Sequence, residues 1–244
     1  GRLGMAGAPL ARLRLRWQLL RARHPVATHG IIGTNVAVWG LYTAAPESAR
    51  APPAGWWPRT APTPPAGLGA LGDWLPTRAF WERHFFASYH GAIMNWRIES
   101  VPLCTFMHMD GYHLLFNMVT VFFFGQQLER LLGFGRFVAF YLASGSAAAA
   151  AQVVACGRRE RFAKVLGASG GAYALVAYTT CFMPRQTVLL YMVVPVPMWL
   201  LMAGLVAADV LLVRPGEGQV GHLAGAGCGA AYYVLRFRKW RFWR

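Results

Sequence analysis

Long apolar segments constrain the fold of this chain more than any other feature of its sequence. Six of them occur, at approximately residues 27–46, 112–132, 137–156, 168–184, 187–213 and 221–237. A helix of about 20 apolar residues crosses the hydrocarbon core of a bilayer and satisfies its own backbone hydrogen bonds there. The sequence therefore predicts an all-α polytopic membrane protein with six transmembrane helices.

The composition agrees with this prediction. Of the 244 residues, 56% are hydrophobic and 14% are charged, so the chain is more apolar than an average soluble domain. Pro195 and Pro197 interrupt the fifth apolar segment. We expect them to kink a helix over 187–213 without ending it, because neighbouring helices can satisfy the freed carbonyl groups.

The sequence divides into three regions. Residues 1–26 form a basic, arginine-rich segment, 27–237 form the membrane domain, and 238–244 form a basic tail. The membrane domain includes a long first loop, 47–111, which is rich in proline at its start and in aromatic and charged residues later. Amphipathic aromatic side chains favour the membrane interface, so we expect this loop to lie at the bilayer surface, partly embedded.

The formal net charge of +15 raises the question of nucleic acid binding. The basic residues flank apolar segments instead of forming one stripe, so we expect lipid and no nucleic acid as a partner. They are more numerous on the side of the two termini, which predicts that both termini face the matrix or the side of synthesis. The stretch ARLRLRWQLLRAR has the arginine pattern of a mitochondrial targeting region or its remnant, and it favours the mitochondrial inner membrane.

Few polar residues lie at or within the apolar segments, and such residues usually face a cavity or a neighbouring helix. His108 precedes the second segment, and His113 and Asn117 lie one helical turn apart near its start. Ser169 opens the fourth segment, and His222 lies at the start of the sixth. These five residues are the candidates for chemistry.

Each candidate also has a structural explanation. Histidine and asparagine within a membrane helix commonly bond to a neighbouring helix, and a serine among glycines permits close packing. Two pairs of small residues four positions apart favour such packing: Gly167 with Gly171, and Gly225 with Gly229. Together, however, Ser169 and His222 stand at the same depth on two glycine-rich helices that could approach to hydrogen-bonding distance.

Such a pair has a chemical use. A serine hydroxyl becomes a nucleophile when a neutral histidine takes its proton, so Ser169 and His222 form a candidate catalytic dyad. The oxyanion that develops on an attacked carbonyl needs donors, and His113, Asn117 and the backbone N–H of Ser169 could supply them. Tyr173 follows Ser169 by four residues, so its ring could pack against His222 and hold the imidazole.

Other catalytic chemistries fit the sequence less well. The sequence contains no HExxH motif, which would indicate a zinc site, and we expect no cofactor or metal. Asp209 is the one aspartate within an apolar segment and shows no evident link to His222, which leaves a dyad and excludes an aspartyl pair. Lys164 precedes Ser169 by five residues in a polar loop, which does not favour a serine–lysine pair. Four widely spaced cysteines indicate buried, reduced thiols: Cys104, Cys156, Cys181 and Cys228.

The spacing of these residues resembles the rhomboid family of intramembrane serine proteases. The motifs that carry the resemblance are H108-x4-H113-x3-N117, G167-A-S169-G170 and H222-x2-G225-x3-G229, with NWR at 95–97 and FGQQLERLLGFGRF at 124–137 in support. The resemblance extends over roughly 28–237. The proline-rich insert in the first loop and the segment before His108 depart from the family pattern.

The resemblance implies a six-helix bundle whose serine helix begins part-way down a water-filled cavity. It implies these roles: Ser169 as nucleophile, His222 as general base and then acid, His113 and Asn117 at the oxyanion, Tyr173 stacked on the base, and His108 as a structural residue near the cavity mouth. The implied substrates are single-span membrane proteins, and the arginine pattern favours the mitochondrial branch. An alternative stays open, in which the chain is a catalytically idle rhomboid-like subunit that contacts partner subunits of a larger membrane assembly.

Overall fold

The computed structural model describes residues 24–46, 76–190, 193–213 and 218–241. Predictions for 1–23, for the proline-rich part of the first loop at 47–75 and for 242–244 lie outside the described residues. The first half of the chain contains α2 (Val26–Ala44), α4 (Arg78–Phe85), η1 (Tyr89–Met94), α5 (Ser100–Leu103), η2 (Cys104–Phe106), α6 (Gly111–Thr120) and η3 (Val121–Gly125). The second half contains α7 (Gln126–Leu132), α8 (Phe134–Cys156), α9 (Ser169–Phe182), β1 (Thr187–Leu190), β2 (Val194–Pro197), α10 (Met198–Leu212) and α11 (Val220–Arg241).

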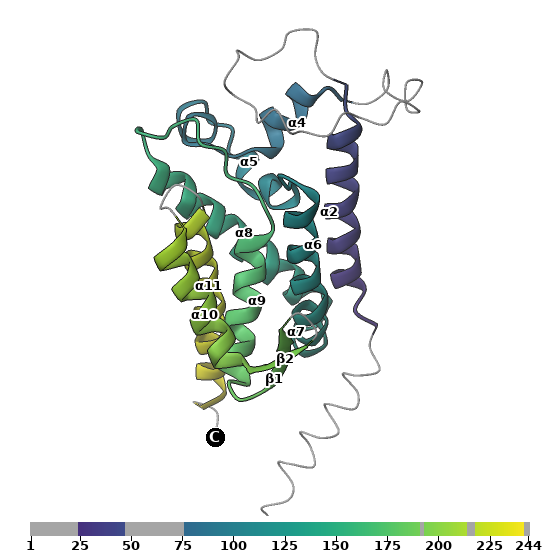
Figure 1. The fold of residues 1–244 in the computed structure, drawn as a ribbon, viewed down its shortest axis with the longest axis vertical. Helices are drawn as coiled ribbons and strands as arrows, with labels where there is room; N and C mark the ends of the chain where they lie inside the picture. The colour runs from purple at the N-terminus through teal and green to yellow at the C-terminus, as the bar shows by residue number, and fades with distance from the viewer. Residues whose placement is uncertain (1–23, 47–75, 191–192, 214–217, 242–244) are drawn as a thin grey trace, which may run out of the picture.

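Helix α9 is the central element of the bundle. It packs against α6, α8, α10 and α11, and Figure 1 shows it in the middle of these helices, with α2 on the far side of α6. The short helices α4 and α5 lie at one end of the bundle, and the two strands lie at the other. Nine of the fourteen residues of α9 are buried, which explains why this helix is composed almost entirely of small and apolar side chains.

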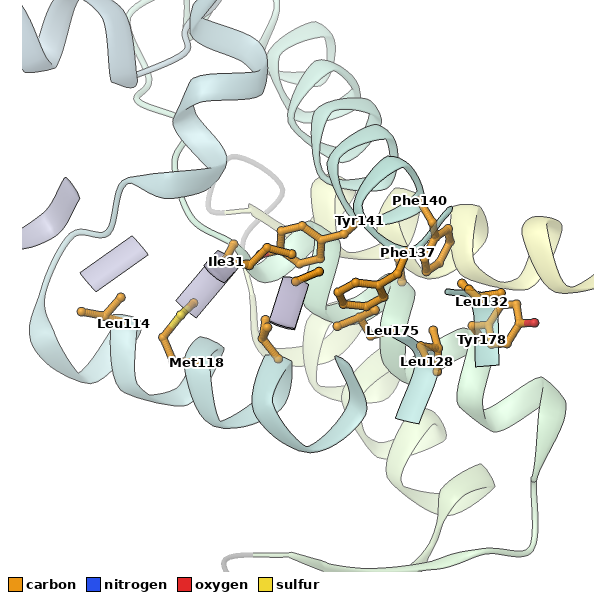
Figure 2. Packing of buried hydrophobic residues seen from close by; sticks show 14 residues of the cluster. Ile31, Leu114, Met118, Leu128, Leu132, Phe137, Phe140, Tyr141, Leu175 and Tyr178 are labelled. Carbon is orange, nitrogen blue, oxygen red and sulfur yellow. The ribbon is translucent and has the colours of Figure 1, made fainter. Parts of the chain in front are cut away.

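One hydrophobic core fixes α9 to the helices on its α6 side (Figure 2). It includes Ile31 of α2, Met118 of α6, Leu128 of α7, Phe137 of α8 and Leu175 of α9. Phe137 and Leu175 are completely buried, and burial of a side chain of this size contributes about 1.5–3 kcal/mol. The position of Ser169 at the first turn of α9 is therefore set by packing along the rest of that helix.

A buried carboxylate joins the start of α2 to α7. The Glu129 side chain accepts hydrogen bonds from the backbone N–H groups of Ala27 and Thr28 at 2.8 and 2.7 Å, and from the Thr28 hydroxyl at 2.7 Å. The first N–H groups of a helix have no partner within the helix, so Glu129 satisfies two of them and complements the helix dipole. This residue belongs to the FGQQLERLLGFGRF stretch noted in the sequence.

Most of the predicted membrane segments coincide with described helices. The first, third, fourth and sixth correspond to α2, α8, α9 and α11, and the second corresponds to the continuous run α6, η3 and α7. Among the described helices, α8 alone is both long and apolar enough to cross a membrane, and α10 is a shorter apolar helix. The structure is mostly helical, and the count of six crossings stays a prediction.

The prediction of one kinked helix over 187–213 is wrong in its first half. Residues 187–197 contain the antiparallel strands β1 and β2, in which Thr187 faces Pro197 and Leu189 faces Pro195. Valine favours extended backbone, and proline restricts the residue before it to extended conformations, so the VPVP sequence is better suited to an edge strand than to a helix. The helix begins only after Pro197.

The close packing of α9 and α11 follows from two glycines of α11. A side-chain carbon added at Gly225 would overlap the backbone of Gly170, and one added at Gly229 would overlap the backbone of Ala174. The predicted close approach through Gly225 and Gly229 is confirmed. The predicted contribution of Gly167 and Gly171 to the same contact is wrong: Gly171 faces Tyr141 of α8, and Gly167 faces His113 of α6.

Candidate active site

Ser169 is the first residue of α9, and the segment before it is held by backbone contacts. Ala87 and Val165 form an antiparallel bridge with N···O distances of 3.0 and 2.7 Å, and the Gly167 N–H donates to the Cys104 carbonyl at 2.9 Å. Gly167 has a φ of +117°, a conformation that residues with side chains rarely adopt. The chain therefore turns sharply at Gly167 and presents Ser169 at a fixed place.

His222 lies in the first turn of α11 and contacts Ser169 directly. Its Nε2 is 2.9 Å from Ser169 Oγ, a contact between residues 53 positions apart. The Tyr173 ring stacks on the imidazole with centroids 4.5 Å apart and an angle of 11° between the planes. The Gly221 N–H also donates to Gln152 Oε1 of α8 at 2.9 Å, so the start of α11 is held on a second side. The serine–histidine contact and the Tyr173 stacking expected from the sequence are both present.

Asp209 contacts the other nitrogen of His222, which the sequence analysis did not expect. Its Oδ1 is 2.9 Å from His222 Nδ1, and the aspartate is 2% exposed. The expectation that Asp209 has no link to His222 is wrong, because α10 and α11 pack side by side and bring residues 13 positions apart together.

His113 and Asn117 occupy different places relative to the serine. The His113 side chain lines the same cavity as Ser169 and His222. Asn117 is buried one turn further along α6, and its amide donates to the His113 carbonyl at 2.9 Å. Among the described residues that line the cavity, His113 is present and Asn117 is not. The structure thus brings one of the two expected oxyanion donors into the cavity.

His108 is completely buried beside the loop that carries the serine. The Ala168 N–H donates to His108 Nε2 at 3.4 Å, and the His108 ring meets the His113 ring edge to face at 5.0 Å between centroids. Burial is the main cause that lowers the pKa of His108 to about 3, and the neighbouring His113 adds to it. An Nε2 that accepts a hydrogen bond requires a neutral ring, and this bond from Ala168 joins His108 to the loop before Ser169.

The serine and the histidine open into a cavity of about 150 Å³. One water needs about 10–15 Å³ of such space, so the cavity is large enough to admit water to the hydroxyl. Small residues of α8 and α9 line it, including Gly145, Ala148 and Gly170, and leave room beside the hydroxyl. Cys104 also lines it, but burial raises the pKa of its thiol to about 12, which keeps the thiol protonated and unreactive.

Comparison with known proteins identifies the family. Residues 94–239 match the model of the rhomboid domain. This chain belongs to the rhomboid family. A curated relative is the RHOMBOID-like protein 12, mitochondrial, of Arabidopsis thaliana, which is 29% identical over 163 residues. The aligned part covers 60% of this chain and 48% of the relative, so the chain matches about half of that protein's length.

The matched region contains every candidate residue of the rhomboid domain described above, from His108 to His222. Sequence reasoning missed the contact of Asp209 with His222, and it missed Gln152, which lines the cavity and accepts from the Gly221 N–H. Both are polar residues within largely apolar helices, which is the signal that could have found them. Gln152 lies in the alanine-rich α8, and Asp209 in α10, where each is 2% exposed.

Proposed function

We propose that this rhomboid protein is an intramembrane serine protease that cleaves single-span membrane proteins with Ser169 and His222. The observation that carries the proposal is the 2.9 Å contact between Ser169 Oγ and His222 Nε2 at the edge of a cavity. A hydroxyl hydrogen-bonded to a histidine is the arrangement that activates a serine for attack.

The proposed chemistry proceeds in two steps. Ser169 Oγ attacks the carbonyl carbon of the scissile peptide while its proton passes to His222 Nε2, and a tetrahedral oxyanion forms. Collapse breaks the C–N bond, and His222 returns the proton to the leaving amine. Water then attacks the acyl ester, again giving its proton to His222, and Ser169 regains its hydrogen as the acid leaves.

Charge on the oxyanion has two sources of stabilisation. The N–H groups in the first turn of α9 have no partners within the helix, and the positive end of the helix dipole lies at Ser169. The His113 side chain in the cavity is the proposed side-chain donor. We propose that Asn117 assists from one turn further along α6, where its amide now bonds to the His113 carbonyl.

The proposed setting is the mitochondrial inner membrane. Six crossings by α2, the run from α6 to α7, α8, α9, α10 and α11 would place both termini in the matrix, as the distribution of basic residues favours. The relative from Arabidopsis thaliana bears the description mitochondrial, which supports this location. The substrates are then transmembrane proteins whose helix must open locally, because a hydrogen-bonded helix shields its own carbonyls.

The test is labelling of the detergent-purified protein with a fluorescent fluorophosphonate, in which Ser169 Oγ forms a bond to phosphorus and fluoride leaves. We expect labelling of the wild type and loss of labelling in Ser169→Ala and in His222→Ala. Ser146→Ala is the matched control, since this half-buried serine of α8 lies outside the cavity lining and should leave labelling unchanged.

A folded wild type that takes no label would contradict the proposal. The chain would then be better described as a catalytically idle rhomboid-like subunit, and its interactions with other membrane proteins would become the subject of study.

A further inference from the structure

The carboxylate of Asp209 is buried, although most side chains of α10 are at least partly exposed. Met198 and Asp209 are the two buried residues of this helix, whereas Leu211 and Leu212 are 78% and 80% exposed. Burial of a carboxylate in an apolar environment is unfavourable unless a specific interaction offsets it. The arrangement of α10 therefore places its one acidic residue toward the base and its large apolar residues outward.

The contact between Asp209 and His222 selects one form of the imidazole. An ionised carboxylate only accepts hydrogen bonds, so at a separation of 2.9 Å the Nδ1 of a neutral His222 carries the hydrogen and donates it to Asp209 Oδ1. The other nitrogen, Nε2, then has a free lone pair, and it is the atom 2.9 Å from Ser169 Oγ. The opposite tautomer could not accept the serine proton.

We propose that Asp209 is the positioning residue of this site, which holds His222 in the reactive tautomer and stabilises the imidazolium that forms when Ser169 attacks. The inference rests on the proposed function and extends its dyad to a triad of residues on α9, α11 and α10. In the step itself, the proton of Ser169 moves to His222 Nε2, the Nδ1 hydrogen stays on His222, and Asp209 remains a carboxylate.

The structure offers a control variant that distinguishes the effect of the Asp209 carboxylate on His222 from a purely structural effect of the backbone at Asp209. The Gln219 side chain donates to the backbone carbonyl of Asp209 at 2.9 Å, whereas His222 contacts the carboxylate. Gln219→Ala therefore perturbs the same residue through its backbone. Asp209→Asn removes the charge at constant size, and Asp209→Glu restores it on a longer side chain.

The test measures fluorophosphonate labelling kinetics, which separate the maximal rate kinact from the concentration dependence KI. We expect Asp209→Asn to lower kinact by about 10²- to 10⁴-fold, the upper value being that of the same change in other Ser-His-Asp proteases, with KI little changed. Asp209→Glu should recover part of kinact, and Gln219→Ala should stay within a few-fold of wild type.

Each other result has a distinct meaning. Labelling of Asp209→Asn at the wild-type rate overturns the role of Asp209 and leaves the serine–histidine proposal intact. An equal loss in Asp209→Asn and Gln219→Ala, with a lower melting temperature in both, shows a structural role only and also overturns it. Absence of labelling in the folded wild type overturns both proposals together.

If Asp209→Asn does not fold, a second measurement tests the tautomer of His222 in the wild-type protein. In wild-type protein with ¹⁵N-labelled histidine, His222 Nδ1–H should give a proton resonance shifted far downfield by its bond to the carboxylate, and His222→Ala identifies it by its loss. A spectrum in which His222 carries its hydrogen on Nε2 overturns the inference.

Discussion

At the residue scale, Gly167 connects backbone conformation to the shape of the cavity. Its φ of +117° is unfavourable for any residue with a side chain, and an added side-chain carbon would lie 2.8 Å from His113 Cε1. No carbon atom is tolerated at that distance, so either His113 or the serine loop must move. Glycine is thus required at this position for two reasons: the positive φ and the close approach of the His113 ring.

The expected result for Gly167→Ala is a fall in fluorophosphonate labelling of about 10²-fold or more, because a displacement of about 1 Å at a catalytic group has an effect of this size. Gly204→Ala is the control, since Gly204 lies in α10 with open space around it and an ordinary backbone conformation. Comparable labelling of Gly167→Ala and Gly204→Ala would show that the turn at Gly167 does not position the serine.

The sequence predicts several of the site's contacts, and it misses the contact between Asp209 and His222 for a physical reason. The pairing of Ser169 with His222 and the stacking of Tyr173 follow from their places near helix starts and from the spacing of four residues within α9. Asp209 lies 13 residues before His222 on a different helix, and the rotation of α10 about its axis determines which way it points. Side-chain spacing carries no information about that rotation.

At the element scale, the contact between α9 and α11 determines whether the serine and the histidine meet. Gly225 and Gly229 lie directly against the α9 backbone, and His222 lies less than one turn before Gly225. A side chain at this contact would push the two helices apart, and the displacement would extend to the start of α11. The distance between Ser169 Oγ and His222 Nε2 therefore depends on residues outside the cavity.

We expect Gly225→Ala to abolish most fluorophosphonate labelling and to lower the melting temperature. Overpacking of a tight contact costs about 1–3 kcal/mol of stability. Gly227→Ala is the matched control in the same helix, because an added carbon at Gly227 meets no atom within 4 Å. Labelling at the wild-type rate in Gly225→Ala would mean that the contact relaxes without moving the base.

Patterns of apolar residues predict most of the helices but do not predict the hairpin of β1 and β2. Length and hydrophobicity predict five of the segments, since each apolar stretch largely coincides with a helix: α2, the run from α6 to α7, α8, α9 and α11. The hairpin of β1 and β2 is apolar too, and hydrophobicity alone does not distinguish its strands from a helix. Alternating valine and proline carry the distinguishing information, through their backbone preferences.

At the scale of the whole molecule, the bundle holds the three proposed site residues toward one of its ends. The serine, the histidine and the aspartate come from α9, α11 and α10, while α4 and α5 lie at the same end and the hairpin lies at the other (Figure 1). If the six helices cross the membrane as proposed, the end with the cavity faces away from the matrix, and the hairpin and the carboxyl-terminal residues face it.

This orientation predicts the outcome of protease protection in isolated mitochondria. An epitope tag after residue 244 should resist added protease until the inner membrane is opened, and the protein should stay in the membrane fraction after alkaline carbonate extraction. A tag inserted in the first loop should become accessible once the outer membrane alone is ruptured. Digestion of both tags at the same stage would contradict the even number of crossings.

The order of the helices along the chain has a consequence for biosynthesis. The proposed nucleophile is synthesised in α9, but the proposed base lies in α11, which follows all the other described helices, and the two are 53 positions apart. On the proposed mechanism, a nascent chain contains an inert serine until α11 docks against α9. Proteolytic competence would then arise only at the end of assembly, which protects the neighbouring membrane proteins from an incompletely folded enzyme.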